Sequence, residues 1–174
     1  VFAQAGVGGL ASGVLATMWL GMKQRPLFTV LEPTRADCVY QSIARGERTD
    51  VTIADETVMA GLSCGEVSTL AWPVLRDGAA AAIAIDDIFA LEGMRRFAKP
   101  LAGDPAIVAG ECSGGALGAL LALKDRADLR AALHLDATSR VLLIGTEGDT
   151  DAAIYHEAVG MTAAQVLAQN GDRS

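Results

Sequence analysis

The first segment whose residues could do chemistry is the glycine-rich run Gln4-Ala5-Gly6-Val7-Gly8-Gly9-Leu10. It follows a short apolar stretch and precedes a longer one, an order typical of a strand, a turn and a helix. Backbone N–H groups at such a turn, with the positive end of the helix dipole, form an anion site that a phosphate can approach closely. The run is neither a GxGxxG nor a Walker motif, so a tight turn without a ligand is the other interpretation.

A second candidate segment, Gly145-Thr146-Glu147-Gly148-Asp149-Thr150-Asp151, directly follows the apolar run RVLLI. Ligands of open α/β sheets bind beyond the carboxyl ends of the strands. The Thr146 hydroxyl would lie at that edge, where it could bond a ring nitrogen or a phosphate. The alternative is a polar loop in which Asp149 or Thr150 caps the next helix.

A third candidate segment, Gly110-Glu111-Cys112-Ser113-Gly114-Gly115, lies between an apolar stretch and a helix-forming one. Glu111 would place a carboxylate near the same edge of the sheet. The alternative is a packing turn in which Ser113 is the helix N-cap.

The elements that must position these segments alternate along the chain. We predict helices over residues 10–22, 34–44, 86–98, 113–123, 128–133 and 151–159, with shorter turns near 57–62 and 71–76. We predict strands over residues 27–31, 79–85 and 140–145, the last being the clearest buried strand. Helix 10–22 is apolar all round and is expected to be buried, with Thr34 as the N-cap of the following helix. The segment after Gly160 is expected to be helix that fades into disorder.

This alternation predicts one α/β domain with an open, mostly parallel sheet and helices on both faces. The chain has 174 residues, 51% of them hydrophobic, which excludes a disordered chain. Abundant glycine and few aromatic residues suit close packing of helices on a sheet.

Charge and cysteine content exclude several classes of partner. There are 14 basic and 21 acidic residues, a net charge of -7, and no basic cluster, which argues against nucleic acid and membrane surfaces. No apolar run reaches the roughly 20 residues that span a bilayer. Three cysteines, at positions without zinc-ligand spacing, predict no metal site and a reducing, cytoplasmic location.

The start of the chain lacks a methionine and opens on the apolar residues Val1-Phe2-Ala3. We interpret them as the end of a strand and expect the chain to be a piece of a longer protein.

Five strings, in this order, resemble the C-terminal half of the diaminopropionate ammonia-lyase family: QAGVGGLASG, VLEPTRADCVY, TVMAGLSCGE, EGMRRFA and LIGTEGDTD. This family belongs to the fold-type-II pyridoxal-phosphate enzymes, with the serine and threonine dehydratases and the tryptophan synthase β chain. The resemblance runs from Val1 to about Gly160. It implies that residues 1–160 are the C-terminal part of the large cofactor-binding domain and that 161–174 form a C-terminal tail.

The resemblance also implies a cofactor site for pyridoxal 5'-phosphate. Thr146 would face the pyridine nitrogen and leave it unprotonated, and Glu111 would lie close to the ring. Cys112 stands where the family is expected to have serine next to the glutamate, a departure that leaves the role of this turn open. The phosphate would be held by the backbone of Gly6, Val7, Gly8, Gly9 and Leu10.

The resemblance places cysteines of the family at the positions of Cys38 and Cys64, so one interpretation is a spatial pair that could form a disulfide. Two reduced thiols packed in a cytoplasmic enzyme are the alternative that we prefer.

A pyridoxal enzyme needs a lysine for its Schiff base, and the lysines here, Lys23, Lys99 and Lys124, all lie in polar surroundings that indicate solvated surface. The resemblance places the catalytic lysine, and the acidic residue that assists proton removal, in a missing N-terminal half. No catalytic residue is therefore expected in this chain, which should be inactive alone.

The implied activity is α,β-elimination of 2,3-diaminopropionate to pyruvate and ammonia. The implied partners are the N-terminal half of the same enzyme, a small amino-acid substrate and a second subunit in a homodimer. One alternative is a lyase resembling the serine or threonine dehydratases. The other is a non-catalytic fragment or paralogue that keeps only the anion site.

Overall fold

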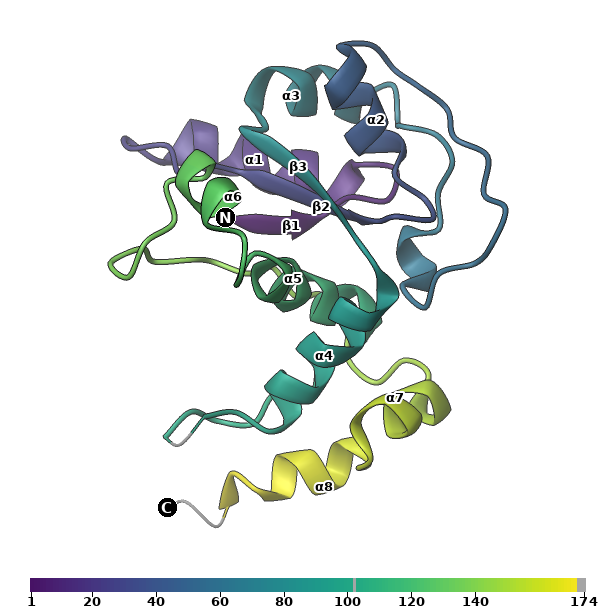
Figure 1. Ribbon diagram of the computed structural model, residues 1–174, viewed down its shortest axis with the longest axis vertical. Helices are drawn as coiled ribbons and strands as arrows, with labels where there is room; N and C mark the ends of the chain where they lie inside the picture. The colour runs from purple at the N-terminus through teal and green to yellow at the C-terminus, as the bar shows by residue number, and fades with distance from the viewer. Residues whose placement is uncertain (102, 172–174) are drawn as a thin grey trace.

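The computed structural model describes residues 1–101 and 103–171 (Figure 1). Three strands, four α-helices and one 3₁₀ turn come first in chain order: β1 (Phe2–Gln4), α1 (Gly9–Gly21), β2 (Thr29–Pro33), α2 (Cys38–Arg45), the 3₁₀ turn η1 (Ala60–Leu62), α3 (Ala71–Gly78), β3 (Ala81–Ile85) and α4 (Asp87–Ala98). Four further helices follow: α5 (Glu111–Ala122), α6 (Ala127–Ala132), α7 (Ala152–Val159) and α8 (Ala163–Ala168).

The strands form one parallel sheet in the order β1-β2-β3, with Phe2 opposite Thr29 and Thr29 opposite Ala81. Parallel strands connected by helices require crossovers, and the sequence alternation had predicted this arrangement. The predicted α/β class with an open parallel sheet is confirmed.

The predicted strand 140–145 is wrong in its extent and burial. It is an extended segment joined to the free edge of β1 by one bridge, Phe2 to Leu143. The Phe2 amide donates to the Leu142 carbonyl at 2.9 Å and the Ile144 amide to the Phe2 carbonyl at 3.1 Å. Because β1 has only three residues, it cannot form a longer ladder with this segment. The apolar run therefore lies half-buried at the edge of the sheet and is not a central strand.

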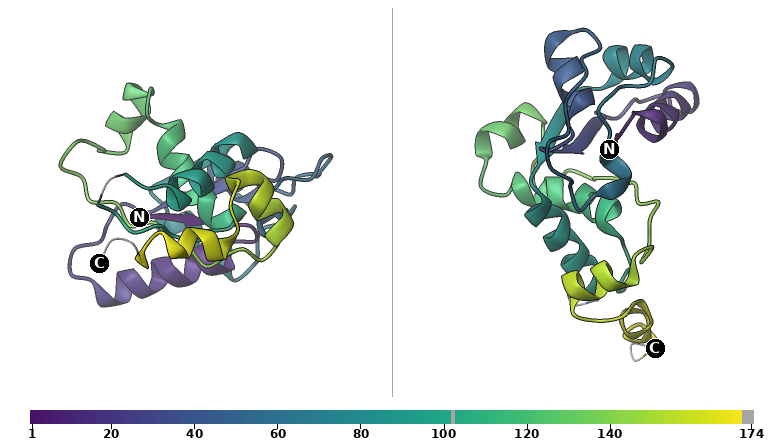
Figure 2. Two further views of the ribbon diagram at one scale, coloured as in Figure 1. Left: turned by 90° about the horizontal axis from the view of Figure 1, so that it is seen from below. Right: turned by 90° about the vertical axis from the view of Figure 1, so that its right-hand side faces the viewer.

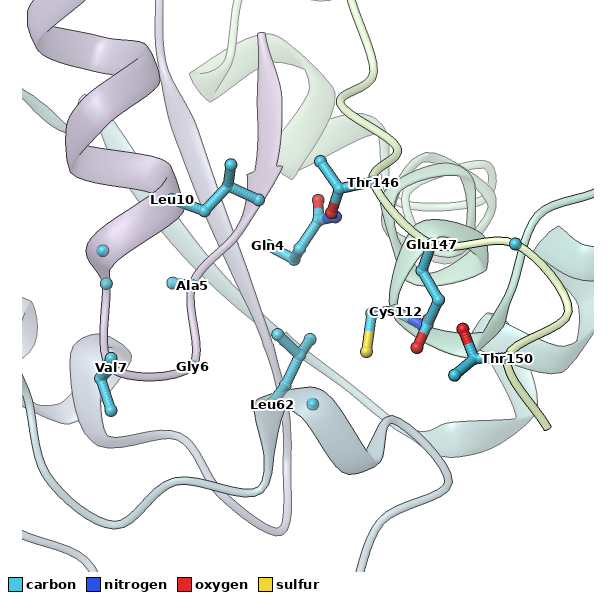
Figure 3. A pocket seen from close by; sticks show the side chains of 14 residues that line it. Gln4, Ala5, Gly6, Val7, Leu10, Leu62, Cys112, Thr146, Glu147 and Thr150 are labelled. Atoms are coloured by element: carbon cyan, nitrogen blue, oxygen red, sulfur yellow. The ribbon is translucent and has the colours of Figure 1, made fainter.

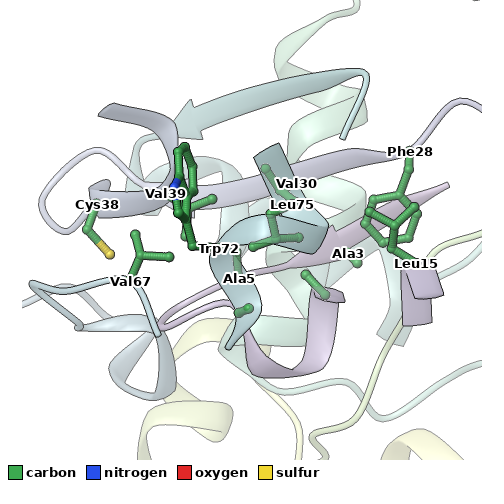
Figure 4. Close-up of a cluster of buried hydrophobic side chains, with 12 residues drawn as sticks. Ala3, Ala5, Leu15, Phe28, Val30, Cys38, Val39, Val67, Trp72 and Leu75 are labelled. Carbon is green, nitrogen blue, oxygen red and sulfur yellow. The ribbon is translucent and has the colours of Figure 1, made fainter. Parts of the chain in front are cut away.

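One face of the sheet packs against α1, α2 and α3 (Figure 4). Ala3 and Val30 from the strands meet Leu15 of α1, Val39 of α2 and Leu75 of α3, all fully buried or nearly so. This layer fixes the start of α1 against the end of β1.

The opposite face packs against α4 and α5, as Figure 1 shows below the sheet. Phe2, Leu31 and Ile85 of the strands contact Ala90 of α4 and Ala116 of α5. A third cluster joins α4 to α7 and α8, which lie at one end of the molecule (Figure 2).

Helix α1 has the predicted bounds to within one residue, but it is not buried all round. Ala11 and Leu15 are its buried residues, whereas Leu20 is 91% exposed. Its other faces meet no layer within the part of the chain that the structure describes. The prediction of a fully buried helix, made from its apolar sequence, is therefore wrong.

Thr34 is not the N-cap of α2, because that helix starts four residues later, with Asp37 at the cap position. The Thr34 hydroxyl instead donates to Asp86 Oδ1 at 2.7 Å, and its amide donates to the Ile85 carbonyl at 2.9 Å. Thr34 thereby ties the end of β2 to the end of β3.

The segment after Gly160 does not fade into disorder over its described residues. Thr162 and Gln165 form a capping box at the start of α8. The Asn170 side chain accepts from the Ala106 amide at 2.7 Å and donates to the Ala106 carbonyl at 2.9 Å. The last three residues, 172–174, lie outside the described residues.

Candidate functional site

A cavity of about 440 Å³ opens beyond the carboxyl end of β1 (Figure 3). Its size is within the range of small-molecule pockets. It is lined by Gln4, Ala5, Gly6, Val7, Gly8, Gly9, Leu10, Gly61, Leu62, Cys112, Thr146, Glu147, Gly148 and Thr150. The first and second candidate segments of the sequence therefore meet in one place, although more than a hundred residues separate them.

The glycine loop that forms one wall has a backbone that requires glycine. Gly8 has φ of 91°, and a Cβ there would lie 2.7 Å from Leu75 Cδ1. Gly6 has φ of 31°. Gly9, in contrast, would have no atom within 4 Å of an added Cβ, so the loop faces open space at that residue.

The start of α1 presents unused hydrogen-bond donors to this cavity. Gly8 is its N-cap and supplies no side-chain bond, and the first turn contains no acidic residue. Ser12 is the first residue of the helix whose amide donates to the preceding turn, to the Gly8 carbonyl at 2.9 Å. The amides of Gly9 and Leu10 have no acceptor among the described residues, so they are available to an anion.

Thr146 lies across the cavity from this loop, on the turn that follows the edge segment (Figure 3). Its amide donates to Ser113 Oγ at 3.1 Å. Its hydroxyl is 3.4 Å from Gln4 Nε2, a long contact in which the amide donates. Thr146 therefore lies at the edge of the sheet, where the sequence predicted it.

Gln4 is a site residue that the sequence reasoning missed. It is the last residue of β1 and is 3% exposed, with its side chain directed toward Thr146 in Figure 3. Its Oε1 is buried with no partner among the described residues. A glutamine directly before a glycine turn, at the end of a strand, was the signal that could have identified it.

The Glu147 side chain accepts a hydrogen bond from the first turn of α5 and also lines the cavity. Its Oε2 accepts from the Cys112 amide at 2.7 Å, and its carbonyl accepts from the Gly110 amide at 3.1 Å. Burial, and then the nearby Glu147 charge, raises the pKa of the Cys112 thiol to about 12, so this thiol is not a thiolate nucleophile at neutral pH.

Glu111, predicted to lie near the ligand, is the first residue of α5 and is not among the residues that line the cavity. It is 6% exposed, and its Oε1 has no partner among the described residues. Burial raises its pKa, and the charges of Glu147 and Asp151 raise it further. The structure brings its neighbours Cys112 and Glu147 to the cavity instead.

Behind the glycine loop lies a group formed by the buried Glu32 and Cys38 and the half-buried Cys64. Cys38 Sγ contacts the Gly6 carbonyl at 3.5 Å and Glu32 Oε1 at 3.7 Å. All three cysteines, Cys38, Cys64 and Cys112, are free thiols, so Cys38 and Cys64 are not joined by a disulfide. Burial raises the pKa of Cys38 to about 12 and also raises that of Cys64.

Lys23, Lys99 and Lys124 are all exposed, and none of them lines the cavity. Among residues 1–101 and 103–171, no group of three or more potential metal ligands comes together. No helix in this part of the chain is long and apolar enough to cross a membrane.

Comparison with known proteins places these features in a family. Residues 1–147 match the family described as "Pyridoxal-phosphate dependent enzyme". The chain is 40% identical over 163 residues to diaminopropionate ammonia-lyase of Escherichia coli (strain K12), covering 91% of this chain and 41% of that protein. The enzyme of the same name from Salmonella typhimurium is also 40% identical, over 90% of this chain and 40% of its own length. The chain thus spans about two fifths of these relatives.

Solved structures give the same result. The E. coli ammonia-lyase in complex with an aminoacrylate-PLP azomethine reaction intermediate superposes with a TM-score of 0.82 at 39% identity, over 91% of this chain and 41% of that one. Maize serine racemase superposes with a TM-score of 0.63 at 27% identity, over 76% of this chain and 39% of that one.

Proposed function

The chain belongs to the family of pyridoxal-phosphate-dependent enzymes, and we propose that it is the C-terminal part of an ammonia-lyase whose pyridoxal 5'-phosphate is anchored in the cavity beside β1. The observation that carries this proposal is the meeting of a glycine loop, with free amides at a helix start, and the Thr146 hydroxyl across one small-molecule cavity. The whole reaction requires residues outside this chain.

The residues of the cavity fit this cofactor. The free amides of Gly9 and Leu10, at the positive end of α1, suit a phosphate dianion without any lysine or arginine in the lining. An added Cβ at Gly8 would collide with Leu75 of the core, so this residue can present only its backbone to the cavity. The unpartnered Gln4 Oε1 is a buried polar atom of the kind that a ligand satisfies.

Each part of the cavity would have one task. The backbone of Gly6, Val7, Gly8, Gly9 and Leu10 would hold the phosphate. The Thr146 hydroxyl would bond the pyridine nitrogen, and because a hydroxyl is not a charged acid it would leave that nitrogen neutral. When bound, the cofactor supplies the electron sink for cleavage of bonds at the substrate Cα. Glu111 would lie close to the cofactor ring without lining the cavity.

We propose α,β-elimination of 2,3-diaminopropionate to pyruvate and ammonia as the activity of the complete enzyme. The support is the 40% identity to ammonia-lyases of that name over most of this chain. The exposed positions of all three lysines support a Schiff-base lysine supplied by the N-terminal part, and hence inactivity of this chain alone.

The same reasoning extends to domains and partners. Residues 1–160 would form the C-terminal part of the cofactor-binding domain, with 161–174 as the tail. The partners would be the N-terminal part that the relatives possess, the amino-acid substrate and a second subunit. We also propose a cytoplasmic location, supported by the low cysteine content, which cell fractionation would test.

Cofactor anchorage is tested by comparing Gly9→Asp with Gly9→Asn in the complete enzyme. An added Cβ at Gly9 meets nothing within 4 Å, so both variants should fold. Aspartate at the first turn is favourable to the helix, so any loss is not one of helix stability. We expect Gly9→Asp to raise the Kd for pyridoxal 5'-phosphate about a hundredfold by repelling the phosphate and Gly9→Asn far less. Equal Kd values in the two variants would refute the placement of the phosphate.

Substrate choice is tested by pyruvate release from the complete enzyme with 2,3-diaminopropionate, serine or threonine. Preference for diaminopropionate is the expected result. Preference for a hydroxy amino acid would instead indicate a dehydratase. The similarity to maize serine racemase, whose name indicates serine as its substrate, supports this alternative. No turnover and no cofactor binding would favour a non-catalytic module.

A further inference from the structure

Ser113 has a buried hydroxyl whose hydrogen bonds all go to one turn. It is the third residue of α5 and is 1% exposed. Its Oγ donates to the Glu147 carbonyl at 3.0 Å and accepts from the amides of Thr146 at 3.1 Å and Glu147 at 3.0 Å. A serine hydroxyl has one donor and two acceptor sites, so these three bonds use its full capacity.

None of these hydrogen bonds caps the helix in which Ser113 lies. The N-cap of α5 is Gly110, so the alternative interpretation of this segment, in which Ser113 caps the helix, is wrong. The start of the helix is served by other groups, since Glu147 Oε2 accepts from the Cys112 amide. Ser113 therefore joins α5 to a turn more than thirty residues later in the chain.

The turn fits closely against this part of α5. An added Cβ at Gly145 would lie 3.4 Å from Ser113 Oγ, and one at Gly110 would collide with the Gly148 carbonyl oxygen. The backbone on both sides of Thr146 is thus held against the helix. The Thr146 side chain is exposed, and the long Gln4 contact is its one side-chain hydrogen bond among the described residues.

We propose that Ser113 is a positioning residue of the cofactor site, which fixes the backbone of Thr146 so that its hydroxyl faces the ring nitrogen of the bound cofactor. The inference rests on the proposed function, because it assigns Ser113 a task only if Thr146 meets the cofactor. Ser113 itself does not line the cavity and acts through Thr146.

A double-mutant cycle tests this, using Ser113→Ala, Thr146→Ala and the double variant of the complete enzyme loaded with cofactor labelled with ¹⁵N in the ring. The readouts are the ¹⁵N resonance of the ring nitrogen and the Kd for the cofactor, neither of which depends on turnover. Each single variant should shift the resonance in the same direction and raise the Kd about tenfold, the loss of one ordinary hydrogen bond. In the double variant, Ser113→Ala should add no further change.

Ala119→Gly is the matched control, because Ala119 is fully buried in the same helix and forms none of the hydrogen bonds that hold the turn. It should lower the stability of α5 and leave the ¹⁵N resonance unchanged. Ser113→Cys, which keeps a weaker donor and acceptor of similar size, should give an intermediate shift. If Ser113→Ala is too unstable to purify, this variant and its double with Thr146→Ala carry the test.

The results separate the two ideas. A ¹⁵N resonance that Ser113 variants leave unchanged, or effects on the Kd that add fully in the double variant, would overturn the role of Ser113. Failure of the unsubstituted enzyme to bind the cofactor, or a ¹⁵N resonance unmoved by Thr146→Ala, would overturn the proposed site itself.

Discussion

The buried position of Glu32 raises the pKa of its carboxyl group far above the ordinary value. Glu32 lies at the end of β2, 1% exposed, and its carboxyl oxygens accept from the amides of Val39 at 3.2 Å and Tyr40 at 2.7 Å. Burial raises the pKa of Glu32 to about 8, and the charge of Asp37 adds to this, while the two amide bonds act in the opposite direction. Desolvation is thus the larger effect here.

This pKa predicts a pH dependence of stability. In the unfolded chain Glu32 loses its proton near the ordinary value of 4.5, whereas the folded protein keeps it until about pH 8. Between these values the folded state binds more protons, so the free energy of unfolding falls as pH rises, by at most about 1.4 kcal/mol per pH unit, and levels off above pH 8.

Glu32→Gln should therefore flatten the urea-unfolding free energy between pH 5 and pH 8, measured by circular dichroism. Glu66→Gln is the control, since Glu66 is exposed and should leave the slope unchanged. An unaltered slope in Glu32→Gln would show that Glu32 is ionised in the folded protein.

Among single residues, type and local pattern indicated the glycine loop and Thr146 as candidates, and the structure brings both to one cavity. Ser113 was considered only as an alternative helix cap, and Gln4 was given no role. Both act across the fold, on partners that lie more than thirty and more than a hundred residues away. Spacing along the chain carries no information about such contacts.

The pairing of α4 with α5 depends on glycine in both helices. An added Cβ at Gly93 would collide with the Gly114 carbonyl oxygen, and one at Gly118 would lie 2.5 Å from the Phe89 carbonyl oxygen. The two helices thus touch backbone to backbone. Because α5 holds the Thr146 turn, this contact also sets one wall of the cavity.

Gly93→Ala should lower the free energy of unfolding by about 2–3 kcal/mol, because the buried contact has no room for a methyl group. Gly13→Ala in α1 is the control, since an added Cβ there meets nothing within 4 Å. It should raise stability by about 0.5–1 kcal/mol through helix propensity alone. Urea titration of both variants measures the difference, and a neutral Gly93→Ala would contradict the close helix contact.

Most elements were predictable because their apolar spacing is regular, as in α4, where the predicted and observed ranges differ by one residue. The edge segment at Leu143 was not, because the same apolar letters suit a central strand and a half-paired edge. What decides between them is the number of neighbouring strands, which the sequence of one segment does not contain.

Considered as one body, the molecule leaves apolar side chains uncovered at α1 and the segment after it. Leu20 is 91% exposed, and Met22 and Leu27 are each about half exposed. Exposed apolar residues of this kind are typical of a surface that further protein covers, here the N-terminal part of the enzyme or a second subunit. Self-association of the complete enzyme distinguishes the two.

Leu20→Glu in the complete enzyme should weaken self-association about tenfold or more, since a charge would be buried at the contact. Leu70→Glu is the control, because Leu70 is 87% exposed at a different place, just before α3. Analytical ultracentrifugation over a dilution series distinguishes the two. Equal association of both variants would show that α1 is not the contact surface.

The bridge between Phe2 and Leu143 also bears on the biosynthesis of the protein. Gln4 and Thr146 are separated by 142 positions, which a ribosome needs about 7–28 s to translate. The glycine loop therefore emerges long before the turn that completes its cavity. Until translation passes that turn, a nascent chain has the glycine loop without the opposite wall of its cavity. Capture of the proposed cofactor at this site therefore requires that the Thr146 turn has been translated.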